Sequence, residues 1–444
     1  MKFRYLVLLS FAILAMTGCD SIKKSDPEYI IDISSIGIPE QTEPTTEPPF
    51  RATSVSFTAV GDNLIHSYVY HTAKEQANQD NDDDYDDNKK NDDKENNDKE
   101  YDFHYCYENI ADRIANADLA FINQETLICN GKYDVSGTNL NFNSPVELGN
   151  DLIDIGFDIF NIGNNLLLDK TAEGLEACLD YWSDQQFEHD NLVVIGGYYN
   201  EEDMQDYRII KTKGLKFGFL GYTDHTNGYS LPESSELQIV YMDNEELMQQ
   251  QIQELSEQVD CVIVSAHWGE EDTHEVTDSV KELAQKFIDW GADVVIGTGS
   301  HTLQTMEYLT RADGSQGFVF YSLGNFISAQ TDNFNMVGGM GMFDICRDTQ
   351  GDITIENVKL MPLITHYDSG ITNVRVYPYD LYTDELIEKH YVPYSGGGTF
   401  KSWNREVIDS IIQENVPKEF QLLTAPKNDK AEEQETETES NSNA

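Results

Sequence analysis

The sequence predicts a layered α/β fold. Apolar runs of strand length alternate with helix-like segments over most of the chain, and short polar clusters follow several of these runs. Layered α/β folds carry their functional loops at the ends of such strands. The polar clusters are Val-Gly-Asp62 with His66, Asn123-Gln-Glu125, Asn164-Asn165, Ala-His267-Trp-Gly-Glu270 and Gly-Ser-His301. Asp, Glu, Asn and His converging at one edge of a sheet predict a metal site.

The predicted elements alternate from residue 55 to residue 322. Short apolar runs predict strands, and longer segments with helical spacing predict helices. The predicted strands are Val55–Val60, Leu119–Ile122, Ile159–Gly163, Val193–Ile195, Phe217–Tyr222, Asp260–Ala266, Val294–Ile296 and Phe318–Ser322. The predicted helices are Tyr107–Asn116, Val146–Ile155, Thr171–Gln185, Asn244–Gln258 and Val276–Trp290. After Gly338 the pattern changes, and Met340–Arg347, Ile353–Pro362 and Thr372–Pro378 are predicted to be antiparallel strands that complete a sandwich.

The N-terminal segment is typical of an export signal. Lys2 and Arg4 precede an apolar run from Tyr5 to Ala15, which is short for a mature membrane-spanning helix. Small residues and Cys19 follow, so residues 1–19 resemble a bacterial lipoprotein signal with Cys19 as the acylated residue. A simple cleaved signal peptide and an uncleaved anchor are the alternatives. All three place the domain outside the cytoplasm, and the lipid would hold it on the extracytoplasmic face of the cell membrane.

Much of the negative charge lies in two segments that are not expected to fold, one inserted within the predicted domain of residues 51–425 and one after it. The formal net charge is −51. Residues 20–50, rich in Ser, Thr, Glu and Pro, are predicted to form a flexible tether. An acidic insert at residues 74–102 and an acidic tail at residues 426–444 contain too few apolar residues to fold and are predicted to be disordered. So acidic a chain repels phosphate backbones, which argues against a nucleic-acid partner.

Six motifs together resemble the capsule-synthesis CapA family, which includes the poly-γ-glutamate synthesis accessory proteins and is related to calcineurin-like metallophosphoesterases. The resemblance covers about residues 55–330. The motifs are Phe57-Thr-Ala-Val-Gly-Asp62, Phe121-Ile-Asn-Gln-Glu125, Asn164-Asn165 with Asp169 and Gly174, Ala266-His-Trp-Gly-Glu270, Gly291-Ala-Asp-Val-Val-Ile-Gly297 with His301-Thr-Leu-Gln304, and Tyr321-Ser-Leu-Gly-Asn-Phe326. The resemblance implies a four-layer α-β-β-α sandwich of the metallophosphoesterase type with a two-metal site.

The resemblance also implies roles for single residues. Asp62, His66 and His301 would hold one metal, Glu125 would bridge, and Asn165 and His267 would bind the second. His66 is equally compatible with a surface loop. Asn164, Glu270 and Asn325 are predicted to contact substrate or to support the ligands. This ligand chemistry suits manganese, iron or zinc better than calcium.

Two positions depart from the family pattern. Leu166 stands where the family usually has a histidine that would act as a general acid, and Gly299 stands where it often has a metal ligand. General acid catalysis typically contributes about 10²–10⁴-fold to a rate. The sequence therefore predicts weak or absent hydrolysis, and one bound ion rather than two.

The resemblance leaves three functions open. The first is a surface-anchored protein that assists capsule or poly-γ-glutamate synthesis or export beside a membrane polymer synthase, with the metal site binding an anionic polymer. The second is an extracellular metal-dependent phosphoesterase acting on small phosphoesters. The third is a non-catalytic binding scaffold.

Overall fold

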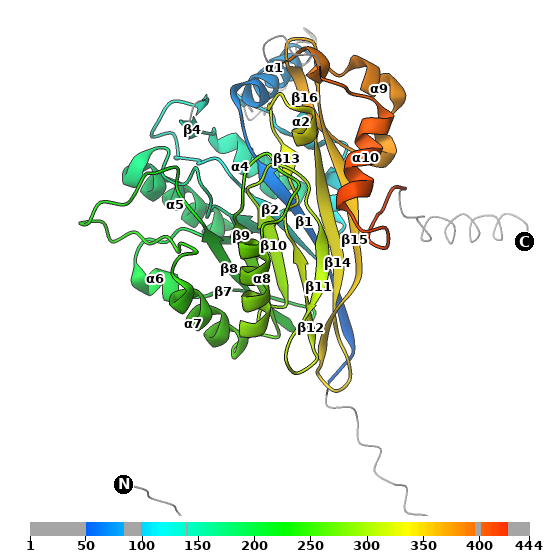
Figure 1. The fold of residues 1–444 in the computed structure, drawn as a ribbon. Helices are drawn as coiled ribbons and strands as arrows, with labels where there is room; N and C mark the ends of the chain where they lie inside the picture. Colours follow the sequence, from blue (N-terminus) through cyan, green and yellow to red (C-terminus); the bar gives the residue numbers. More distant parts are fainter. Residues whose placement is uncertain (1–49, 84–98, 139–140, 396–400, 425–444) are drawn as a thin grey trace, which may run out of the picture. The chain divides into compact units, whose positions relative to one another are not determined.

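The computed structural model describes residues 50–83, 99–138, 141–395 and 401–424 (Figure 1). The predicted signal segment with Cys19, residues 20–49 of the tether and the acidic tail lie outside these residues. Within the described part of the chain, no helix is both long enough and apolar enough to cross a membrane.

The larger sheet has eight strands. Its parallel half is formed by β1, β2, β5 and β6, and its antiparallel half by β14, β15 and β16, with β13 paired to β1. In sheet order the strands are β16 (Thr372–Pro378), β15 (Ile353–Asp368), β14 (Val337–Arg347), β1 (Thr53–Asn63), β2 (Leu119–Asn123), β5 (Ile159–Asn161) and β6 (Val193–Ile195), with β13 (Asn325–Ile327) beside β1. The antiparallel strands after Gly338 confirm the predicted change of pattern.

The smaller sheet has six strands, and β8, β9, β10 and β12 run parallel. In order the strands are β11 (Met306–Thr310), β12 (Gln316–Phe320), β10 (Val294–Thr298), β9 (Cys261–His267), β8 (Leu215–Thr223) and β7 (Arg208–Thr212). A two-stranded ribbon, β3 (Ser136–Gly137) and β4 (Phe142–Asn143), lies apart from both sheets in the hydrogen-bonding pattern.

Helices cover the outer faces of both sheets (Figure 1). The α-helices are α1 (Ser67–Asp83), α2 (His104–Tyr107), α3 (Ala111–Ala115), α4 (Val146–Ile155), α5 (Thr171–Glu188), α6 (Glu201–Gln205), α7 (Glu245–Ser256), α8 (Asp278–Trp290), α9 (Asp384–Lys389) and α10 (Arg405–Asn415). Short 3₁₀ helices are η2 (Asn333–Met336), η3 (Tyr379–Leu381) and η4 (Val392–Tyr394).

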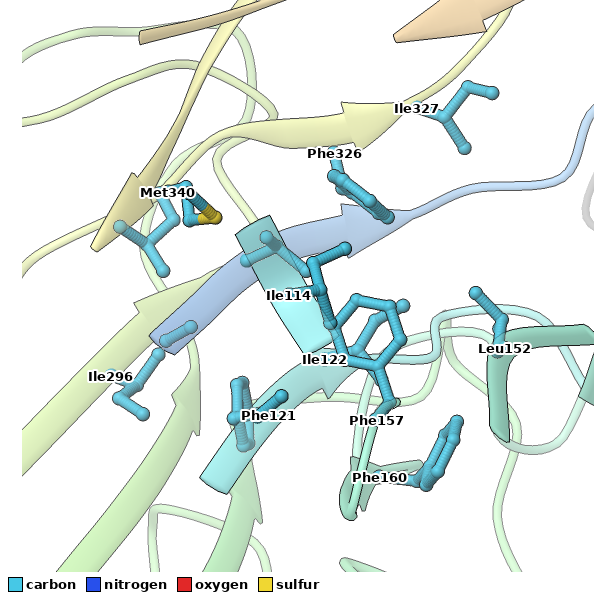
Figure 2. Close-up of a cluster of buried hydrophobic side chains, with 14 of the residues drawn as sticks. Ile114, Phe121, Ile122, Leu152, Phe157, Phe160, Ile296, Phe326, Ile327 and Met340 are labelled. Atoms are coloured by element: carbon cyan, nitrogen blue, oxygen red, sulfur yellow. The ribbon is translucent and has the colours of Figure 1, made fainter. Parts of the chain in front are cut away.

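Alternating side chains bury the smaller sheet on both faces. Cys261 and Ile263 of β9 belong to the main core, whereas Val262 and Val264 pack in a second cluster with α7 and α8. Figure 2 shows Phe121 of β2 and Ile296 of β10 in one cluster of buried side chains, so the two sheets share a core. The layers are therefore helix, sheet, sheet and helix, which confirms the predicted α-β-β-α sandwich.

Two predicted segments differ from the structure. The predicted helix Tyr107–Asn116 is interrupted, because α2 ends at Tyr107 and α3 begins only at Ala111. Helix α1 occupies residues 67–83 and so covers the first part of the insert predicted to be disordered. Its contact with the core is a narrow stripe of Val69, Ala73 and Ala77, spaced one turn apart, which the surrounding polar residues obscure in the sequence.

The rest of the predicted insert is only partly described. Residues 84–98 lie outside the described ranges, whereas Tyr101 is buried against the main core. Lys99 Nζ lies 2.8 Å from Asp151 Oδ1 in α4. The C-terminal residues of the insert are therefore held in place by the buried ring of Tyr101 and the ion pair of Lys99. The acidic composition of the segment gives no sign of these contacts.

Candidate metal centre

The predicted polar clusters meet where the parallel strands of both sheets end. Asp62 near the end of β1 is aligned with Asn123 at the end of β2, and His267 at the end of β9 is aligned with Thr298 at the end of β10. Parallel strands place their carboxyl ends at one edge of a sheet, so successive strands deliver these side chains to a common place. Glu125 and His301 follow in the loops after β2 and β10.

Asp62 is fully buried and is held by three donors. Asn123 Nδ2 donates to Oδ1 at 2.8 Å, and the backbone nitrogen of Gly299 donates to Oδ2 at 3.2 Å. His301 Nδ1 lies 3.1 Å from Oδ2. Burial acts to raise the pKa of Asp62, but the hydrogen bond and the charge of His301 outweigh burial, so the pKa is lowered. Asp62 is therefore a fixed, ionised carboxylate.

Glu125 is also buried, but neither of its carboxylate oxygens has a hydrogen-bond partner. Its Oε1 lies 3.7 Å from His301 Nε2 and 3.9 Å from His267 Nε2. Burial raises the pKa of Glu125 well above its usual value, and the charge of His301 opposes this rise. A buried carboxyl group without donors is costly unless a cation neutralises and coordinates it.

Asp62, Glu125 and His301 fit a metal ion. Each offers one ligand atom, and these atoms lie within 4.8 Å of one another. Burial acts to lower the pKa of His301, but the charges of Glu125 and Asp62 raise it to about 10. Two carboxylates and an imidazole with two orphaned oxygens are the donor set expected around a divalent transition metal. The structure thus brings together three of the predicted ligands.

His267 lies outside the group of three ligands, but its ring is oriented by neighbouring side chains. Nδ1 lies 3.1 Å from Thr298 Oγ1 and 3.4 Å from Asn123 Nδ2. Burial lowers the pKa of His267 to about 4, against the charge of Asp62, so the ring is neutral at physiological pH. A neutral imidazole is the form that binds metals, and Nε2 is the nitrogen that faces Glu125.

The two asparagines after β5 have different roles. Asn164 shapes its own loop, because Nδ2 donates to Gln124 O at 3.1 Å and Oδ1 accepts from Leu166 N at 3.1 Å. Asn165 Nδ2 donates to Glu271 Oε1 at 3.4 Å, and its buried Oδ1 has no partner. Asn165 thus offers a ligand oxygen, whereas Asn164 supports the backbone.

His66 lies outside the group of three ligands. The backbone nitrogen of Ala329 donates to its Nδ1 at 3.2 Å, and its ring meets Phe142 edge-on at 5.4 Å. The same Nδ1 lies 3.3 Å from the carbonyl oxygen of Leu64, which can only accept, so the two contacts require opposite tautomers. Burial lowers the pKa of His66 to about 4, so the ring is neutral, and its role as a ligand stays a prediction.

The other two predicted support residues, Glu270 and Asn325, have different surroundings. Glu270 is exposed, and the adjacent Glu271 is the residue that reaches Asn165. Asn325 is buried and ties together the loop after β13, since Nδ2 donates to Ser328 Oγ at 3.1 Å and Asn335 O at 3.2 Å.

Sequence reasoning missed Asn161 and Asn335. Asn161 Nδ2 donates to Asn123 Oδ1 at 2.8 Å and so orients the amide that holds Asp62. Asn335 Nδ2 donates to the carbonyl oxygen of His301 at 3.1 Å. The sequence contains a signal for Asn161, because β2 and β5 both end on an asparagine. It contains none for Asn335, which lies 34 residues from His301.

The two departures from the family pattern have structural consequences. Leu166 packs with Leu64 and Phe142 in a small buried cluster. Gly299 has a φ of +102°, and a Cβ there would lie 3.1 Å from His267 Nε2. Position 299 thus contributes a backbone donor to Asp62 in place of a side-chain ligand.

A second group of possible ligands is formed by Asp102, His104 and Asp151. Its atoms are already partnered: Lys99 Nζ donates to Asp151 Oδ1 at 2.8 Å, and the backbone nitrogen of Phe103 donates to Oδ2 at 2.8 Å. His104 Nδ1 lies 3.0 Å from Asp102 Oδ1. This group therefore lacks the orphaned oxygens that mark the first.

An α-β-β-α sandwich with a buried carboxylate and imidazole cluster at its strand ends defines a protein with a candidate metal centre. The family model for the bacterial capsule synthesis protein PGA_cap matches residues 56–330, and the chain belongs to this family.

Curated relatives carry capsule-related names. The chain is 26% identical over 237 residues to the capsule biosynthesis protein CapA of Bacillus anthracis, covering 52% of this chain and 55% of the relative. It is 29% identical over 182 residues to the PGA biosynthesis protein CapA of Bacillus subtilis (strain 168), covering 40% and 44%. The chain thus spans about half the length of the curated relatives it matches.

Solved structures show a more distant likeness. The Haemophilus influenzae NAD nucleotidase NadN aligns with a TM-score of 0.40 and 11% identity, covering 88% of this chain and 68% of that one. A putative 5'-nucleotidase from Staphylococcus aureus aligns with a TM-score of 0.40 and 16% identity, covering 70% and 54%.

Proposed function

We propose that this protein assists the synthesis or export of an anionic capsule polymer such as poly-γ-glutamate, and that Asp62, Glu125 and His301 hold a divalent cation for this task. Membership of the capsule synthesis family supports the process. The unpartnered carboxylate of Glu125, buried beside two histidines, is the observation that supports the cation. Manganese, iron or zinc suits these ligands.

The side chains around the ion would divide the work. Asp62 and Glu125 would neutralise it, and Asn123 and the backbone of Gly299 keep the Asp62 carboxylate in place. A bound divalent ion supplies a Lewis-acidic centre that attracts carboxylate or phosphate oxygens. The ion would thus give an otherwise strongly acidic protein a positive centre for an anionic polymer.

We further propose that the protein is attached to the membrane. Cys19 would carry the lipid, and residues 20–50 would connect it to the domain near a membrane polymer synthase. A Cys19→Ala variant is expected to lose incorporation of radioactive palmitate and to leave the membrane fraction. Unchanged incorporation would refute acylation at Cys19.

Catalysis of phosphoester hydrolysis is the alternative. The position expected to supply an acid is Leu166, which is packed among apolar side chains, and this supports binding over hydrolysis. The functional test replaces both Asp62 and Glu125 in the producing cell and measures secreted glutamate polymer after acid hydrolysis. We expect secretion to fall with the protein level unchanged; normal secretion would contradict the proposed role of the site.

A further inference from the structure

Glu271 is the charged side chain that reaches the proposed centre from the loop between β9 and α8. Its Oε1 accepts a hydrogen bond from Asn165 Nδ2 at 3.4 Å, although the residue itself is exposed. Burial is the main cause of the raised pKa of Glu125, and the charge of Glu125 is the main cause of the raised pKa of His301. The negative charge of Glu271 adds a smaller rise to each. Glu271 is thus an exposed carboxylate that contacts Asn165 and whose charge acts on Glu125 and His301.

The loop that carries Glu271 is firmly attached to the loop of His301. The backbone nitrogen of Asp272 donates to Ser300 O at 2.8 Å, and Asp272 Oδ1 accepts from Asn335 Nδ2 at 2.9 Å. The same Asn335 amide donates to His301 O at 3.1 Å. Asp272 also has a φ of +60°, a conformation that a non-glycine residue adopts at some cost. The backbone beside Glu271 is thus held in place.

Several possible ligand atoms of the proposed centre are left without partners. Both oxygens of Glu125 and the Oδ1 of Asn165 are buried and make no hydrogen bond. The neutral ring of His267 directs Nε2 toward Glu125 at 3.9 Å. A single ion held by Asp62, Glu125 and His301 would leave the oxygen of Asn165 and the nitrogen of His267 unused.

Charge also favours a further carboxylate. Two divalent ions would bring four positive charges, and Asp62 with Glu125 provides two negative ones. Asn165 and His267 are neutral ligands. Position 299 is a glycine and adds no ligand. Its backbone is left-handed, and a Cβ there would crowd His267. Glu271 is the acidic side chain in hydrogen-bond contact with this set.

We propose that Glu271 is a ligand of a second divalent cation, together with Glu125, Asn165 and His267, and that it takes the place of the ligand missing at Gly299. The proposal rests on the proposed function, since Glu125 would be shared with the first ion. On binding, the exposed Glu271 side chain would turn from Asn165 Nδ2 toward the ion, while its backbone stays fixed.

The test compares two adjacent glutamates in the full-length protein purified in detergent. Glu271→Gln removes the proposed ligand charge, and Glu270→Gln is the matched control because Glu270 is an exposed neighbour of the same type. Each protein is stripped with a chelator and titrated with Mn²⁺. Bound manganese is measured by elemental analysis, and paramagnetic resonance reports whether two bound ions are magnetically coupled.

We expect two ions and a coupled spectrum for the wild type and for Glu270→Gln. Glu271→Gln should bind one ion without coupling, with the second affinity weakened at least about 10-fold. Thermal unfolding of the metal-free variants should be unchanged, because both side chains are exposed.

Each other outcome overturns the proposal. Two coupled ions of unchanged affinity in Glu271→Gln would show that Glu271 is no ligand. One ion in the wild type would remove the second position but leave the first and the proposed function intact. No ion in the wild type would refute the cation of the proposed function as well.

Discussion

The backbone nitrogen of Gly299 donates a hydrogen bond to Oδ2 of Asp62 at 3.2 Å. These residues lie 237 positions apart, and the bond connects the end of β1 in one sheet to the loop after β10 in the other. A glycine with a φ of +102° makes this approach possible next to His267. Gly299 therefore lacks the side-chain ligand that the family often has at this position. Its backbone instead holds the carboxylate of Asp62, a predicted ligand that is present.

Gly299→His is expected to destabilise the metal-free protein rather than to restore a ligand. The new side chain would meet a left-handed backbone, costing on the order of 1 kcal/mol, and would crowd His267 Nε2, adding about 1–3 kcal/mol. Gly314→His is the matched control, because its φ is +90° but nothing lies within 4 Å of a Cβ there. Urea unfolding with a chelator present should show the larger loss for position 299. Equal losses would contradict the predicted crowding.

Leu166→His is expected to lower stability by about 2–4 kcal/mol, because it places an imidazole in the buried cluster with Leu64 and Phe142. Leu166→Met, which conserves volume, should cost less than about 1.5 kcal/mol. Hydrolysis of bis(p-nitrophenyl) phosphate should not rise above the wild-type level. A gain of hydrolysis in a stable Leu166→His variant would instead identify an enzyme that has lost its acid.

Glu125→Gln should remove most of the stabilisation that metal binding gives to the folded protein. In the wild type, Mn²⁺ at 100 times its dissociation constant is expected to add about 2.7 kcal/mol to the free energy of unfolding. The glutamine is neutral, so it relieves the burial of a charge when metal is absent but cannot neutralise a cation. We expect the metal-free variant to unfold at or above the wild-type temperature and Mn²⁺ to raise that temperature far less. A rise equal to that of the wild type would exclude Glu125 as a ligand.

Acid should destabilise the C-terminal part of the fold through His366. Its Nδ1 lies 3.0 Å from the Tyr382 hydroxyl, and burial lowers its pKa from 6.5 to about 4 despite the charge of Asp368. Because the folded pKa lies below the unfolded one, the neutral ring contributes stability above pH 6.5 that is lost as the pH falls to about 4. The loss amounts to on the order of 3 kcal/mol.

His366→Gln isolates this contribution, because acidic groups elsewhere titrate equally in both proteins. The variant should be less stable at pH 7, where it lacks the packed ring. The difference in unfolding free energy between the two proteins should narrow between pH 6.5 and pH 4. A difference that stays constant with pH would show that His366 does not titrate on unfolding.

Much of the architecture could be predicted because burial leaves a clear pattern in the sequence. The predicted bounds of α4, β6 and β16 equal the observed ones. Buried apolar side chains recur at helical spacing in α4, follow one another in β6 and alternate along β16. Helix α1 was missed because only a narrow stripe of small residues faces the core. The break between α2 and α3 was missed because the segment keeps helical spacing through the turn.

The site could be predicted only to the level of its strand ends. Asp62, Glu125 and His301 follow apolar strands, so their convergence was visible in the sequence. Glu271 rather than Glu270 contacts Asn165 because of a loop with positive φ at Gly269 and Asp272. The amino-acid composition of this loop does not reveal that conformation. The contact between His66 Nδ1 and the backbone nitrogen of Ala329, which lies 263 residues away, gives no signal in the sequence either.

The central claim is that Asp62, Glu125 and His301 bind a divalent cation. The most direct test is the metal content of the full-length protein by elemental analysis, compared with Asp62→Asn. Asp102→Asn is the control, because it alters the other carboxylate and histidine group of the described residues. We predict at least one ion per chain in the wild type and in Asp102→Asn, and its loss in Asp62→Asn. Full retention of metal by Asp62→Asn, or a wild type without metal, would contradict the account.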